Sequence, residues 1–143
     1  MEIVCDSRIR GEFTGFNDEN VFILDNGQIW YQSVYRYKYI YLYRPRAQIL
    51  NNNGIYYIKV EGMDEAIQVS PLYSYVETRI AGEFRGWKKD SVFKFVNGQQ
   101  WKQAEYKYEY RCLNSPSALI YDAGSGYKLS IEGMTDNIRV KKI

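Results

Sequence analysis

The chain of 143 residues contains no histidine. This absence excludes Ser–His and Cys–His nucleophile pairs, histidine general bases and the commonest transition-metal ligand. The sequence also lacks a glycine-rich loop that opens a helix, so it has no phosphate cradle of that kind. We therefore expect no metal, no cofactor and no enzymatic activity.

Cysteine is scarce, and long apolar runs are missing. The two cysteines, Cys5 and Cys112, occupy non-equivalent places in the chain, which argues against a duplicated disulfide or metal framework. We expect free thiols, with a Cys5–Cys112 bridge as the alternative. No segment is apolar for long enough to span a membrane. Met1 leads into Ile3 without a basic stretch and an apolar core, so we expect a cytoplasmic protein, with export by a leader as the alternative.

Charge is nearly balanced overall, at +2, but it is unevenly distributed. Residues 1–72 hold seven Lys and Arg against nine Asp and Glu, whereas residues 73–143 hold twelve against eight. The second part is therefore the one whose charge favours an anionic partner.

The chain repeats itself. Ser7–Leu72 aligns without gaps with Thr78–Ile143, 71 positions later, and 26 of the 66 aligned pairs are identical. The repeat predicts two domains, 1–72 and 73–143. Units of this size bury only about 60% of their unfolded surface and are marginally stable alone.

The clearest element of the repeat is a hairpin, Val21–Trp30 in the first copy and Val92–Trp101 in the second. Asn-Gly usually forms a two-residue loop. That register would leave the second copy without an apolar face. A three-residue loop, Asp25–Gly27, instead pairs Phe22 with Trp30 and gives both copies one apolar side. We predict the three-residue loop, with both tryptophans in the core.

The remaining pattern predicts an all-β chain. Five or six short strands and one helical turn, Met63–Ala66, fit in each copy, and no longer helical period is present. A closed barrel would remove the adhesive edges of such strands. We therefore predict two tandem small β-barrels packed about a pseudo-twofold axis.

Two segments carry a resemblance to known proteins. The hairpin Val92–Gln103 and the closing segment Tyr127–Ile143 resemble a group of small, uncharacterised bacterial β-barrel proteins with a "VF-L-NGQ-W-Q" hairpin and a "Y-L-IEG" closing strand. The resemblance covers most of the second copy and, more loosely, the first. It implies a Src-homology-3-like barrel and a bacterial source, and it implies no activity.

The most unusual segment has a tyrosine at every second position, which places these side chains on one face of an extended strand. Two alternatives stay open for this tyrosine face: burial, as a seam between the two units, or exposure as an aromatic contact surface. The candidate partner-binding residues are Tyr35, Tyr37, Tyr39, Tyr41, Tyr43, Arg36 and Arg44; the second copy keeps Tyr106, Tyr108 and Tyr110.

Three functions fit this pattern. The first is a non-enzymatic module that binds a protein or peptide through the tyrosine face, including its own copy in a homodimer. The second is a single-stranded nucleic-acid-binding protein, with bases stacked on rings and phosphates held by Arg36, Lys38, Arg44 and Arg46. Against it, the first copy is net acidic.

The third function is a carboxylate-dependent enzyme. It would use the acids that both copies share, Glu12, Glu61, Glu83 and Glu132. An internal pair of these acids with Arg8 and Arg79, the only basic residues identical in both copies, is the simpler explanation. The shared Gln32 and Gln103 would either satisfy backbone groups or contact a partner.

Overall fold

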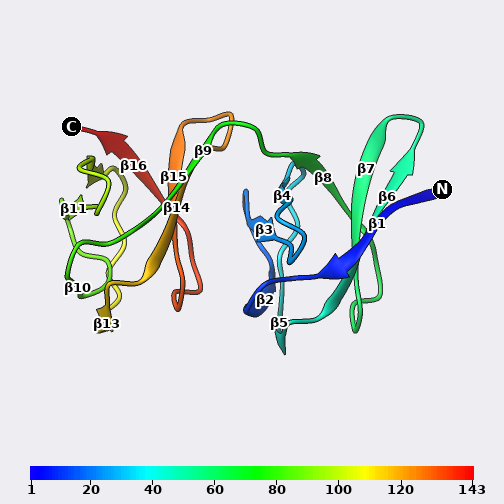
Figure 1. Cartoon of the computed structure of the whole chain (residues 1–143), viewed down its shortest axis with the longest axis horizontal. Helices are drawn as coiled ribbons and strands as arrows, with labels where there is room; N and C mark the ends of the chain where they lie inside the picture. Colours follow the sequence, from blue (N-terminus) through cyan, green and yellow to red (C-terminus); the bar gives the residue numbers. More distant parts are fainter. The chain divides into compact units, whose positions relative to one another are not determined.

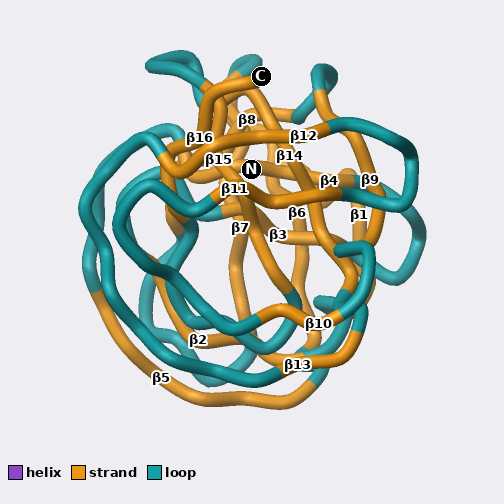
Figure 2. The backbone as a smooth tube through the Cα atoms, turned by 90° about the vertical axis from the view of Figure 1, so that its left-hand side faces the viewer, coloured by secondary structure: helices purple, strands orange, loops and turns teal.

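The computed structural model describes residues 1–143, and all of its regular elements are β-strands. Figure 2 shows strands and loops and no helix. The predicted helical turn at Met63–Ala66 is therefore wrong: the residues form a non-helical turn between two strands. No element is a helix long and apolar enough to cross a membrane. The chain divides into two compact units, Met1–Leu72 and Tyr73–Ile143, at the boundary of the sequence repeat.

The first unit contains one six-stranded antiparallel sheet, in the order β1-β6-β7-β8-β4-β3, and a separate two-stranded sheet, β2-β5 (Figure 1). Successive strands are mostly joined by tight turns, as expected for antiparallel neighbours. The strands are β1 (Glu2–Arg8), β2 (Glu12–Phe16), β3 (Val21–Ile23), β4 (Ile29–Gln32), β5 (Lys38–Tyr43), β6 (Arg46–Asn52), β7 (Ile55–Val60) and β8 (Ile67–Pro71).

The second unit repeats this plan. Its six-stranded sheet has the order β11-β12-β16-β15-β14-β9, and β10 pairs with β13. The strands are β9 (Tyr75–Arg79), β10 (Glu83–Phe84), β11 (Val92–Lys94), β12 (Gln100–Gln103), β13 (Leu113–Asn114), β14 (Ser117–Asp122), β15 (Tyr127–Ile131) and β16 (Ile138–Lys142).

Each large sheet curls until its outer strands meet at one end. In the first unit, Ile9 bridges to Leu24, and the Asp25 amide donates to the Arg8 carbonyl at 2.9 Å. In the second unit, Ile80 bridges to Phe95 in the same way. These contacts provide backbone partners for strand ends that would otherwise be exposed edges.

The hairpins have the predicted three-residue loop. Phe22 pairs with Trp30, and Phe93 pairs with Trp101. The amide of Gly27 donates to the Leu24 carbonyl at 3.0 Å, and its φ of 91° is readily accessible only to glycine. The register predicted by comparing the two copies is confirmed.

Each unit encloses its own core of apolar side chains. Both hairpin tryptophans are buried, as predicted, and each indole nitrogen donates to a glutamine two residues earlier, at 3.2 Å for Trp30 and 3.1 Å for Trp101. The first core is centred on Phe13, Phe16 and Phe22, which meet edge to face or tilted. These tryptophans are therefore core residues and not ligand platforms.

Candidate functional site

The tyrosine face is exposed along its whole length. Strand β5 begins at Lys38, so the predicted strand is too long: Tyr35 and Tyr37 precede it in an irregular segment. The five side chains Tyr35, Tyr37, Tyr39, Tyr41 and Tyr43 are 53–69% exposed. Within the first unit itself the tyrosines therefore lie on the outer face of the strand, and the inner side is the opposite face.

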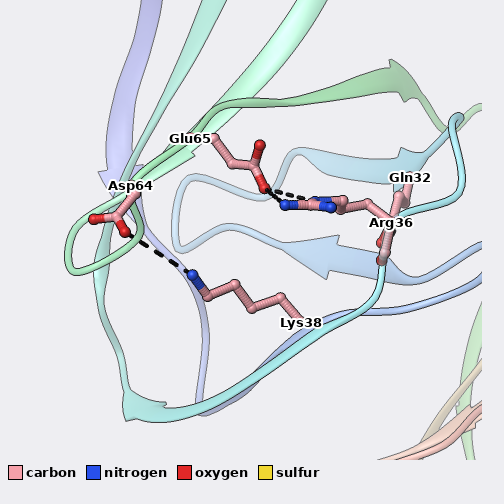
Figure 3. A network of polar contacts seen from close by, with 5 residues as sticks. All are labelled: Gln32, Arg36, Lys38, Asp64 and Glu65. Carbon is pink, nitrogen blue, oxygen red and sulfur yellow. Dashed lines mark hydrogen bonds and ion pairs between the residues drawn. The ribbon is translucent and has the colours of Figure 1, made fainter.

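The residues between the tyrosines attach the segment to the unit. Ile40 and Leu42 pack against the core. Figure 3 shows Arg36 and Lys38 reaching the turn after β7, where Arg36 pairs with Glu65 at 2.5 Å and Lys38 approaches Asp64 at 4.0 Å. Since successive side chains of an extended chain point to opposite sides, these inward anchors orient the tyrosines outward.

A buried glutamine holds the start of the segment. Gln32 is 1% exposed, and its amide nitrogen donates to the carbonyls of Val34 and Arg36, each at 3.0 Å. Its amide oxygen accepts from the Asn17 amide at 3.0 Å. The side chain therefore replaces the ladder hydrogen bonds that an irregular segment lacks, and it is not available to a partner.

Strand β5 passes very close to β2 at Gly15. A Cβ at Gly15 would lie 2.0 Å from the Lys38 carbonyl oxygen, so only glycine fits beneath the strand. Nearby, the Tyr41 hydroxyl donates to the Glu12 carboxylate at 3.2 Å. Partial desolvation and the Glu12 charge raise the pKa of Tyr41. Tyr41 is thus held in place more firmly than a freely rotating surface side chain.

The outer edge of β5 is open, because β5 is hydrogen-bonded only to β2. An unpaired strand edge presents a row of backbone donors and acceptors. The tyrosine face and this open edge adjoin each other on the same strand. Together they offer both side-chain contacts and backbone hydrogen bonds.

The second unit has the same anchoring contacts as the first, but it lacks the long tyrosine face. Gln103 donates to the carbonyls of Glu105 and Lys107, each at 3.0 Å, and Lys107 pairs with Asp136 at 2.8 Å. Tyr106, Tyr108 and Tyr110 are exposed, but the segment contains only the two-residue strand β13. The long tyrosine face is therefore a property of the first unit.

Both cysteines are free, as predicted. Cys112 stands where the first unit has Tyr41, and its thiol donates to Glu83 at 2.9 Å, as Tyr41 does to Glu12. This hydrogen bond to the Glu83 carboxylate raises the pKa of Cys112.

Replacing Glu83 by glutamine is expected to lower the pKa of Cys112 and increase its thiolate fraction at pH 8. Because the thiolate is the nucleophile, alkylation by iodoacetamide should become at least about twofold faster. Mass spectrometry of the alkylated peptides measures this rate. Glu132→Gln, an exposed acid elsewhere in the unit, should leave the rate unchanged, and equal rates in the two variants would contradict the assignment.

The basic residues near the tyrosine face are already paired. Arg44 contacts Asp25 at 2.6 Å and Arg46 contacts Asp6 at 3.1 Å, in addition to the pairs of Arg36 and Lys38. All four cations that would bind phosphates beside the tyrosines therefore have carboxylate partners within the unit. This arrangement disfavours nucleic-acid binding at this face.

The predicted Arg–Glu pairs are wrong. Arg8 donates to the Arg44 carbonyl at 2.8 Å, and Arg79 donates to the equivalent Ser115 carbonyl at 3.2 Å. Arg44 and Ser115 have φ values of 48° and 45°, so the guanidinium groups stabilise two strained turns instead. Glu12, Glu61, Glu83 and Glu132 are all exposed.

Comparison of the chain with protein-family models, with curated proteins and with solved structures found no match. The clearest features of the surface of the first unit are the tyrosine face and the open edge of β5. The sequence predicted the tyrosines, and it offered backbone groups or a partner as the contacts of the shared Gln32; the structure shows the backbone contacts. The second anchor, Glu65, was not predicted.

Proposed function

We propose that this protein is a non-enzymatic binding module whose two units are Src-homology-3-like barrels. We propose further that the tyrosine face of the first unit binds an extended segment of a partner protein. The curled six-stranded sheets and the two-stranded β2-β5 pair support the barrel assignment. The pseudo-twofold packing of the units stays a prediction.

The observation that carries the proposal is an exposed aromatic surface on an anchored segment. Large aromatic side chains are usually buried, and a contiguous exposed patch marks an interaction site. Tyrosine combines a large contact area with a hydroxyl and loses little rotational entropy on binding, which is why binding surfaces favour it. Anchoring by Gln32, Arg36, Ile40 and Leu42 means that little ordering remains to be done on binding.

An extended segment suits the surface better than a globular ligand. The unpaired edge of β5 can add one further strand, with backbone hydrogen bonds providing affinity and side-chain contacts providing selectivity. Tyr39, Tyr41 and Tyr43 lie on the strand that carries this edge. The partner segment would therefore run antiparallel or parallel to Lys38–Tyr43, in contact with the tyrosine rings.

The test uses peptides selected from a random phage-displayed library against the full chain. Replacing Tyr41 and Tyr43 together by alanine should weaken the selected peptides at least about tenfold, because aromatic anchors contribute about 1–2 kcal/mol or more each. Isothermal titration calorimetry measures the affinities. Raising the salt from 50 to 500 mM should change them less than about threefold, since few counterions are released.

The matched control replaces Tyr73 and Tyr75, which are 85% and 40% exposed and lie in the other unit. This double variant should bind the selected peptides as the unaltered protein does. Sedimentation measurements on the same proteins distinguish a foreign partner from a second copy of this chain. Unchanged peptide affinity and unchanged oligomeric state in Tyr41→Ala/Tyr43→Ala would overturn the proposal.

A further inference from the structure

The second unit contains a cleft of about 350 Å³ whose walls carry three lysines. Lys102 on β12 and Lys141 on β16 form one wall as directly opposed cross-strand partners. Lys89, in the loop before β11, and the exposed ring of Tyr106 also line the cleft. A volume of this size lies within the range of small-ligand sites.

The opposed lysines are unfavourable in the absence of an anion. Like charges directly across an antiparallel pair destabilise a sheet. No carboxylate lies within salt-bridge distance of Lys89, Lys102 or Lys141, whereas every lysine and arginine of the stretch 36–46 in the first unit has such a partner. A bound anion would relieve the repulsion between Lys102 and Lys141.

Comparison of the two units shows that this charge is not required by the fold. The positions equivalent to Lys89, Lys102 and Lys141 are Asp18, Tyr31 and Ser70. The same two strands are thus built in the first unit without any of the three lysines. The cationic cleft belongs to the second unit alone.

Two carboxylates, Asp90 and Glu105, also line the cleft. Glu105 accepts a hydrogen bond from the Arg139 amide at 2.7 Å, so its charge is directed partly toward the backbone. Asp90 is exposed to solvent. Three ammonium groups against these two carboxylates leave the cleft net positive. The positions equivalent to Lys89 and Asp90 in the first unit carry Asp18 and Glu19 and no cation.

The aromatic ring determines which anion fits best. Tyr106 is 81% exposed, so one face is free for stacking beside the ammonium groups. Bases stack on exposed aromatic rings while phosphates interact with neighbouring cations. Gln103 also lines the cleft, but its side-chain amide is already hydrogen-bonded to backbone groups and is not available to a ligand.

We propose that this cleft binds a nucleoside phosphate, with the phosphate between Lys102, Lys141 and Lys89 and the base against Tyr106. The ligand is either a free nucleotide or one nucleotide of a single strand. The site is independent of the tyrosine face, so each can fail without the other.

Three probes separate the possible ligands: a fluorescein-labelled ten-nucleotide oligo-dT, free thymidine triphosphate and a labelled decaglutamate peptide. Fluorescence anisotropy follows the labelled probes, and competition against oligo-dT follows the triphosphate. Binding of oligo-dT alone indicates a single strand as the source, and effective competition by the triphosphate indicates a free nucleotide. Decaglutamate binding as tightly as oligo-dT, or no binding of either nucleotide probe, would overturn the proposal.

The variant Lys102→Ala/Lys141→Ala should weaken oligo-dT roughly 10- to 30-fold at 0.1 M salt and reduce the slope of log affinity against log salt by about 1.4, because each phosphate contact contributes about 0.7. The matched control is Lys94→Ala/Lys142→Ala, which removes the same charge from exposed lysines of the same sheet outside the cleft. Equal losses in the two variants would show general attraction to a basic unit and would contradict the site.

A third variant tests the stacking. Tyr106→Ala should weaken oligo-dT roughly fivefold or more and leave the salt slope unchanged, because it removes a ring and no charge. Tyr108→Ala is the control, since Tyr108 is 68% exposed on the same segment and does not line the cleft. If Tyr106→Ala binds oligo-dT as tightly as the unaltered protein does, the base does not stack on Tyr106 and the assignment of a nucleotide is wrong.

Discussion

Replacing Gly86 by alanine is expected to destabilise the second unit by about 3–5 kcal/mol, enough to unfold a unit of this size. A Cβ at this position would lie 1.9 Å from the Glu109 carbonyl oxygen and 2.8 Å from the Arg111 amide. Both are backbone atoms, so no side chain can move aside. The Trp87 amide also donates to the Glu109 carbonyl at 2.8 Å, and relieving the clash would break this hydrogen bond.

The control for this prediction is Gly98→Ala. Gly98 has a φ of 89°, almost the same as the 91° of Gly86, but a Cβ at Gly98 would have no other atom within 4 Å. The backbone conformation alone should therefore cost about 1–2 kcal/mol. Urea unfolding followed by tryptophan fluorescence measures both, since Trp87 and Trp101 are buried in this unit. Equal losses in Gly86→Ala and Gly98→Ala would contradict the steric explanation.

Several features were predictable because the chain is duplicated. Two versions of one hairpin must satisfy a single register, and only the three-residue loop kept Phe22 with Trp30 and Phe93 with Trp101 on apolar faces. The glycine at position 15 was also visible as a repeated residue. The role of this glycine was not predictable, because it depends on the close approach of the Lys38 carbonyl. That carbonyl belongs to another strand, and the local sequence around Gly15 does not indicate which strand lies over it.

The orientation of the tyrosine face was harder to predict. The tyrosines alternate with Arg36, Lys38, Ile40 and Leu42, so both faces of the segment contain apolar and polar groups. Which face turns inward depends on partners that are distant in the sequence. Arg36 pairs with Glu65, and Ile40 and Leu42 pack against the core. The prediction that Arg8 pairs with a glutamate was wrong for a related reason. Its acceptor is the backbone carbonyl of Arg44, and a backbone acceptor leaves no signature in a sequence.

Gln32→Leu is expected to destabilise the first unit by about 2–4 kcal/mol and to weaken the selected peptides at least about tenfold. Leucine has a similar volume but leaves the Asn17 amide and the carbonyls of Val34 and Arg36 without their side-chain partner. The segment 33–37 would have to move outward to reach water. This movement would displace Tyr35 and Tyr37 and loosen the start of β5.

The duplication supplies the control that separates positioning from stability. Gln103 makes the same three hydrogen bonds in the second unit, to the Lys88 amide and the carbonyls of Glu105 and Lys107. Gln103→Leu should therefore lower the free energy of unfolding of the second unit by about as much as Gln32→Leu lowers that of the first. Urea titration measures both losses. Peptide affinity, measured at a urea-free condition where both variants are folded, should fall only for Gln32→Leu. If both variants or neither lose affinity, Gln32 does not position the tyrosine face, because only its own unit carries the five tyrosines.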